Sequence, residues 1–261
     1  MQETVTYQKF IMSRKPRKNG TRTQIIFFVS IFLCVLFLLS FFLFFFAQKR
    51  NLKSYQKSSV FYLSLFSGSN RLTLNENAKK IKELGGAGFE YVSQNKTYVI
   101  AFAYTDKKDA LSVSQNLQEQ YKAEVIEVYF DKISLKAKNK LFSNASLKEC
   151  FDFLYEKVEE SYNLYVDFSK DKITNASLYK IVVQSSMQAK NCLASLSQIV
   201  NENALKDIKS ELLIALNCYE KFCEELLSSL YQGQSINQNL ALFVVNVCEN
   251  ERLVRKKINN L

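Results

Sequence analysis

The chain has 261 residues, of which 48% are hydrophobic and 23% charged, and its formal net charge at pH 7 is +10. It contains no histidine, so the commonest general base and metal ligand at neutral pH is missing. No nucleophile can be paired with a base, and Gly85–Gly88 follows a predicted helix, whereas a phosphate-binding loop precedes one. We therefore expect no enzyme, no cofactor and no metal site.

The positive charge is concentrated in two short stretches. Residues 1–24 and 48–59 together hold ten basic residues and one acidic residue, whereas residues 60–261 hold 25 basic and 24 acidic residues. Both basic stretches flank a long apolar run, where Lys and Arg interact favourably with anionic lipid headgroups. Because the rest of the chain is nearly neutral and has no basic stripe, the sequence argues against nucleic-acid binding.

The apolar run extends over residues 25–47, which are 23 residues without a charge, a glycine or a proline. A helix of this length rises about 35 Å, enough to cross a hydrocarbon core of about 30 Å. A cleaved signal peptide is the alternative, but its apolar stretch is usually about 7 to 15 residues long and needs a small-residue cleavage site. We expect an uncleaved transmembrane helix between a disordered cytoplasmic tail, residues 1–24, and a polar tether, residues 48–59.

The orientation follows from the basic residues on each side of the predicted span. Residues 1–24 contain six of them and residues 48–59 contain four. The leading flank usually dominates, and a long following domain is translocated largely regardless of its charge. The chain is therefore predicted to be a single-pass type II protein of the cell membrane with an extracytoplasmic body.

Residues 60–130 alternate between strand and helix patterns. Gly85 and Gly86 end the first predicted helix, and Asp106 can cap the second. The resulting β-α-β-β-α-β order is that of a ferredoxin-like unit with two helices on one face of a four-stranded sheet. The predicted strands are residues 61–67, 88–93, 97–105 and 123–130, and the helices are residues 74–84 and a segment after Asp106.

Several short motifs in this unit together resemble the SPOR domain. They are Phe61-Tyr62-Leu63-Ser64-Leu65, Glu76-Asn77-Ala78, Leu84 to Phe89, Tyr98-Val99-Ile100, and Asp106 to Ala110. SPOR domains are bacterial modules that bind septal peptidoglycan glycan strands stripped of their peptide stems. The resemblance covers residues 60–130 and implies a role in cell division or sporulation. An anchor, a SPOR module and a further C-terminal region are similar to the architecture of membrane-anchored division and sporulation proteins.

The resemblance also implies that glycan binds on the sheet face turned away from the helices. By strand alternation, Leu63 and Leu65 are expected to face the helices together with Ile100 and Phe102. The opposite face then carries the glycan-binding candidates, which are Tyr62, Ser64, Phe66, Val99 and Ala101. Ser64 and Ala101 stand where the family usually has Gln and a basic residue, so polar anchors for sugar are scarce. The alternative is that protein covers this apolar face.

Residues 131–261 show helical periodicity throughout. After a basic connector, Ser146 and Glu149 form a capping box, and four apolar stripes predict an antiparallel four-helix bundle. The five cysteines of this region are expected to be small buried hydrophobes, with one inter-helix disulfide as the alternative. The stripes run through residues 147–168, 178–200, 205–230 and 240–258.

The sequence thus predicts an α+β chain with a transmembrane helix, a SPOR-like domain at residues 60–130 and an all-α domain at residues 131–261. The first functional hypothesis is an extracytoplasmic envelope protein that binds peptidoglycan glycan strands. The alternative is a non-enzymatic, membrane-anchored scaffold that binds division or sporulation proteins through its sheet face and its bundle.

Overall fold

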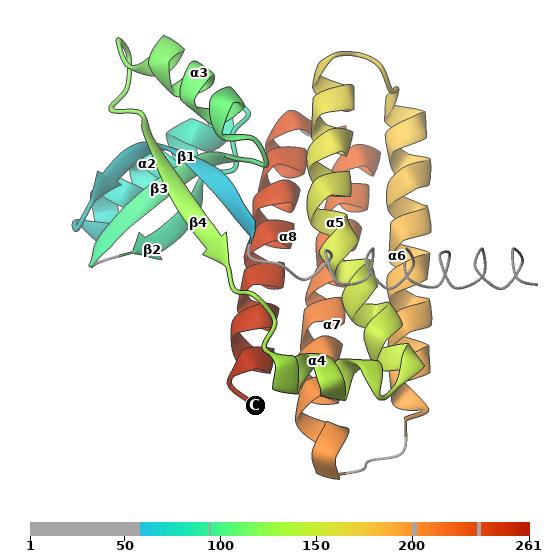
Figure 1. Ribbon diagram of the computed structural model, residues 1–261. Helices are drawn as coiled ribbons and strands as arrows, with labels where there is room; N and C mark the ends of the chain where they lie inside the picture. Colours follow the sequence, from blue (N-terminus) through green and yellow to red (C-terminus); the bar gives the residue numbers. More distant parts are fainter. Residues whose placement is uncertain (1–57, 94, 200–202, 234–235) are drawn as a thin grey trace, which may run out of the picture. The chain divides into compact units, whose positions relative to one another are not determined.

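The computed structural model describes residues 58–93, 95–199, 203–233 and 236–261 (Figure 1). The predicted tail, span and most of the tether lie outside the described residues. Among the helices that the structure describes, none combines the length and the apolarity needed to cross a membrane. The described residues from 58 to 261 belong to one compact unit, so the sheet and the helical region pack together.

The first half of this unit has the predicted β-α-β-β-α-β order. Its four strands form one sheet in the order β2-β3-β1-β4, and all neighbouring pairs are antiparallel. The elements are β1 (Ser58–Gly68), α2 (Arg71–Glu83), β2 (Phe89–Ser93), β3 (Lys96–Tyr104), α3 (Lys107–Leu117) and β4 (Glu124–Phe130).

Local side-chain chemistry sets the ends of these helices. Asp106 caps α3 as predicted, because its side chain accepts hydrogen bonds from the backbone N–H groups of Lys108 and Asp109. Asn70 caps α2 in the same way, so this helix begins earlier than the apolar stripe suggested. Gly85 follows the end of α2 and has a φ of +87°. Residues with a Cβ rarely adopt this left-handed conformation, so a glycine suits this turn.

The second half consists of four long helices and one short one. The long helices run alternately up and down side by side, which agrees with the predicted antiparallel bundle (Figure 1). The backbone N–H groups of Ser146 and Leu147 are capped by Asn144, so the predicted capping box of Ser146 and Glu149 is wrong. The elements are α4 (Leu135–Phe142), α5 (Ala145–Ser169), α6 (Asn175–Ser197), α7 (Asn203–Tyr231) and α8 (Ile236–Asn259).

The short helix α4 occupies the predicted basic connector. Ser134 caps it by accepting a hydrogen bond from the backbone N–H of Ala137, and Ala137 and Leu141 are buried. The end of α8 holds this connector, because Asn259 accepts a hydrogen bond from the Ser134 N–H at 2.7 Å and donates one to the Lys132 carbonyl at 2.9 Å. An amphipathic stretch of eight residues was too short to be recognised as a helix from its periodicity.

Both faces of the sheet are covered by helices. One face packs against α2 and the end of α3, and the other joins the core of the bundle, where α8 contacts β3 and β4 (Figure 1). The first core includes Leu63, Leu65, Ile81, Val99 and Ala101, and the second includes Val60, Tyr62, Ile100, Phe102, Val128 and Phe130.

The alternation predicted for β1 agrees with these two cores at Tyr62, Leu63 and Leu65. It is wrong at Phe66, which packs against the core shared with α2, and the alternation predicted for β3 is wrong as well. Ile100 and Phe102 belong to the bundle core instead of facing α2 and α3, and Val99 lies on the side of α2. The pairing of β1 with β3 shifts on both sides of Ser64, as in a β-bulge. A shift of one residue exchanges the two faces of a strand, and the sequence does not reveal it.

Candidate functional site

The sheet face predicted to bind glycan lies beneath α8. Tyr62 is 0% exposed, and its hydroxyl donates a hydrogen bond of 3.4 Å to the Oε2 atom of Glu249 on α8. Its ring meets the ring of Tyr91 edge-on with centroids 5.2 Å apart. The guanidinium of Arg252 pairs with the carboxylate of Glu249. These four side chains form a closed cluster between the sheet and the bundle, and a sugar ring has no access to Tyr62 in this arrangement.

Burial sets the titration behaviour of this cluster. Desolvation raises the pKa of Tyr62 well above its ordinary value, and the nearby carboxylate of Glu249 acts in the same direction. The pKa of Arg252 is raised by its hydrogen bond with Glu249. Tyr62 therefore stays neutral and donates a hydrogen bond, while Glu249 and Arg252 form an ion pair.

The other predicted glycan-binding residues do not complete a surface with Tyr62. The hydroxyl of buried Ser64 donates a hydrogen bond of 2.8 Å to the carbonyl of Phe66. Phe66 is half-buried and packs edge-on against the Tyr121 ring, with the two ring centroids 5.8 Å apart. Val99 and Ala101 are buried in the core shared with α2. The five candidates are thus divided between the two covered faces and the bulge of β1.

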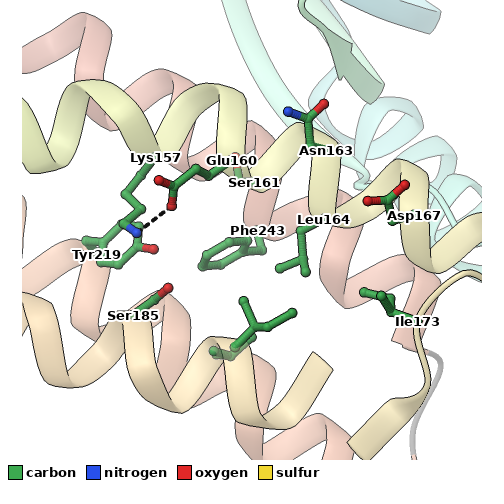
Figure 2. Close-up of a pocket in the computed structure, with 12 residues that line it drawn as sticks. Lys157, Glu160, Ser161, Asn163, Leu164, Asp167, Ile173, Ser185, Tyr219 and Phe243 are labelled. Carbon is green, nitrogen blue, oxygen red and sulfur yellow. Dashed lines mark hydrogen bonds and ion pairs between the residues drawn. The ribbon is translucent and has the colours of Figure 1, made fainter. Parts of the chain in front are cut away.

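A separate pocket of about 290 Å³ lies among the bundle helices (Figure 2). Lys157 of α5 is its most buried charge, since 8% of its side chain is exposed. Its ammonium group donates hydrogen bonds to the carboxylate of Glu160 and to Oε1 of Gln188, the latter at 3.2 Å. It also lies 4.9 Å from the centre of the Phe153 ring. The ammonium is thus held between two helices by a carboxylate, an amide and an aromatic face.

The apolar wall of this pocket contains Tyr219 and Phe243, whose ring centroids are 5.9 Å apart (Figure 2). Burial raises the pKa of Tyr219 well above its ordinary value, so it is not a base at neutral pH. Lys157 is already paired with Glu160 and Gln188. The hydroxyl of Ser185 is engaged in a side-chain hydrogen bond with Tyr219. This arrangement supports packing of the bundle better than acid–base chemistry.

A buried ion pair lies within α8, next to the end of β4. Glu251 and Arg255 are each 1% exposed at the side chain, and Nε of Arg255 donates to Oε1 of Glu251 at 2.7 Å. The guanidinium also donates to the Asp131 carbonyl at 3.3 Å and lies 5.4 Å from the Phe130 ring centre. The Oε2 atom of Glu251 has no hydrogen-bond partner among the described residues. Burial raises the pKa of Glu251 to about 7, although Arg255 opposes that shift.

Sequence reasoning missed both Lys157 and the Glu251–Arg255 pair. A signal was present, because each of these charges falls on an apolar stripe: Lys157 lies three positions after Leu154, and Arg255 lies three positions before Ile258. Charged residues at such positions are buried rarely and then usually in pairs. Across the described ranges, no three His, Cys, Asp or Glu side chains come together as a metal site would require.

Comparisons with known proteins found no match: no family model, no curated protein and no solved structure is significantly similar to this chain.

Proposed function

We propose that this chain is a membrane-anchored, non-enzymatic scaffold of the bacterial cell envelope that binds protein partners. The observation that carries this choice over glycan binding is the complete burial of Tyr62 beneath α8. A glycan site needs an open, concave face with polar groups that orient hydroxyls. Here the corresponding face is used to pack the sheet against the bundle.

The anchor and the orientation belong to the same proposal. The 23 apolar residues at 25–47 would hold the chain in the membrane, and the basic flanks favour a cytoplasmic N-terminus. A reporter enzyme that is active only outside the cytoplasm, fused after Leu261, tests this topology. We expect an active fusion, and an inactive fusion of normal abundance contradicts the extracytoplasmic placement.

Septal glycan binding is the second candidate. The β-α-β-β-α-β order and the strand order β2-β3-β1-β4 favour it, because they agree with the ferredoxin-like unit that the SPOR resemblance implies. If this second candidate is right, glycan binds elsewhere on the β-α-β-β-α-β unit, or it binds after α8 separates from the sheet.

Sedimentation with amidase-treated sacculi separates the two candidates. Full-length protein in detergent is mixed with sacculi, and the pelleted fraction is compared for the parent, Tyr62→Phe and Tyr129→Ala. Tyr129 is an exposed residue of the same sheet and serves as the control for an altered surface. The scaffold proposal predicts no sedimentation above the level without sacculi. If the parent sediments with sacculi, and the pelleted fraction is smaller for Tyr62→Phe but unchanged for Tyr129→Ala, glycan binds on this face instead.

A further inference from the structure

Two cysteines from different helices meet in the bundle. Cys150 of α5 and Cys192 of α6 are 42 positions apart, and the Sγ atom of Cys150 donates to the backbone carbonyl of Cys192 across 3.5 Å. The two thiol groups also interact through a side-chain hydrogen bond. A disulfide can form only between side chains that approach each other from neighbouring backbones, and the contact between Sγ of Cys150 and the Cys192 backbone brings α5 and α6 together at this pair.

The two thiols differ in accessibility. Cys192 is 8% exposed and lines a groove of about 550 Å³ between α5 and α6, whereas Cys150 is 1% exposed and is not among the residues that line this groove. Lys157 lines the same groove, and so does Glu149. A small oxidant that enters the groove therefore reaches Cys192 first.

The two thiols also differ in acidity. The hydrogen bond with Cys150 lowers the pKa of Cys192, and the ammonium of Lys157 adds to this effect, against burial and the carboxylate of Glu149. The same hydrogen bond is the main cause that raises the pKa of Cys150, and burial raises it further. Because the thiolate is the nucleophile in thiol–disulfide exchange, both accessibility and acidity favour Cys192 as the attacking group.

We infer that Cys150 and Cys192 are a reactive dithiol that closes to a disulfide between α5 and α6, with Cys192 as the first nucleophile. With glutathione disulfide as oxidant, the Cys192 thiolate attacks one sulfur of glutathione disulfide, and a glutathione thiolate leaves. Cys150 then gives its proton to water and attacks the Cys192 sulfur, which releases the second glutathione thiolate. Two protein thiols are oxidised, and one glutathione disulfide is reduced to two glutathione molecules.

The disulfide would stabilise the bundle by restricting the unfolded chain. A loop of this length closed by a disulfide raises the melting temperature of a domain of this size by roughly 10 °C. In a cell, the bond persists only where the body lies outside the reducing cytoplasm, and this one point rests on the proposed topology.

The test uses reduced full-length protein in detergent, incubated with glutathione disulfide, alkylated and mapped by mass spectrometry. We expect one peptide pair that joins Cys150 to Cys192, with a rise in melting temperature that Cys192→Ser abolishes. Cys218→Ser, a change at a half-buried cysteine of α7, should leave the pair and the temperature shift unchanged. In Cys150→Ser, glutathione should remain trapped on Cys192.

Two outcomes of the mapping overturn the inference. One is that both cysteines of the parent are fully alkylated even at the highest ratio of glutathione disulfide to glutathione. The other is that the parent keeps glutathione on Cys192 and never forms the Cys150–Cys192 disulfide. Since these measurements are made on the parent, they stand even where a variant fails to fold. A pair that forms in the test tube but is reduced in cells leaves the dithiol inference intact and contradicts the extracytoplasmic topology.

Discussion

Tyr62 in the first strand of the sheet and Glu249 in the last helix of the bundle, 187 positions apart, are joined by a hydrogen bond of 3.4 Å. This contact links the two halves of the described chain, because Tyr62 belongs to β1 at the centre of the sheet and Glu249 to α8. Sheet and bundle should therefore unfold together.

Truncation of Tyr62 should destabilise both halves. Tyr62→Ala removes a fully buried ring, and we expect the free energy of unfolding to fall by about 3 to 5 kcal/mol. Tyr62→Phe removes only the hydroxyl and should cost about 1 kcal/mol, since Arg252 still pairs with Glu249. Tyr129→Ala, on the exposed side of β4, is the control. Urea unfolding of the full-length protein measures all three, and equal midpoints for Tyr62→Ala and Tyr129→Ala would mean that α8 does not cover this face in solution.

A charge at position 101 should disrupt the opposite core. Ala101 is buried beside Leu63 and Ile81, so Ala101→Glu places a carboxylate without a partner between the sheet and α2. We expect a loss of at least about 3 kcal/mol or a failure to fold. The matched control is Val92→Glu on the exposed edge strand β2, which should stay within about 0.5 kcal/mol of the parent. An Ala101→Glu protein with the parent's melting curve is incompatible with the packing of α2.

The Glu251 carboxyl should make stability depend on pH. Its pKa is raised from 4.5 to about 7 in the folded protein, so between these values the folded state binds more protons than the unfolded state. Its contribution is therefore fully present below pH 4.5 and is lost as the pH rises through about 7. The loss amounts to about 3 kcal/mol, because one pKa unit corresponds to about 1.4 kcal/mol.

Urea midpoints of the parent and Glu251→Gln between pH 5 and pH 8 test this dependence. The parent should lose stability over this interval more steeply than Glu251→Gln, whose amide does not titrate. Parallel curves for the two proteins contradict a raised pKa at this position.

Replacement of Lys157 by an apolar side chain should be tolerated. Its partner Glu160 is 56% exposed at the side chain, so removal of the ammonium leaves no buried carboxylate behind. Lys157→Met keeps most of the volume and should change the free energy of unfolding by less than about 1 kcal/mol, whereas Lys157→Ala should cost more because it opens a cavity. Thermal unfolding compares both with Lys221→Met, an exposed control on α7. A large loss in Lys157→Met would show that the ammonium has an essential partner in this pocket.

Local features of the sequence determined the order of the elements and several of their ends. The cap at Asp106 and the turn at Gly85 depend on residues within a few positions of each other, so they can be predicted without a tertiary structure. The apolar stripes likewise predicted α5 to α8, since helical periodicity is a property of a single segment. A stripe shows that a face is buried, but it does not name the element that covers it.

Only the tertiary structure decided which elements cover which faces. The bulge near Ser64 set the register of β1 against β3 and thereby placed Val99 beside α2 and Ile100 in the bundle core. Packing of α8 over the sheet turned Tyr62 from a candidate binding residue into a buried one, and packing of α5 against α6 brought Cys150 to Cys192. Register and helix docking depend on contacts between residues far apart in the chain, and no local pattern encodes such contacts.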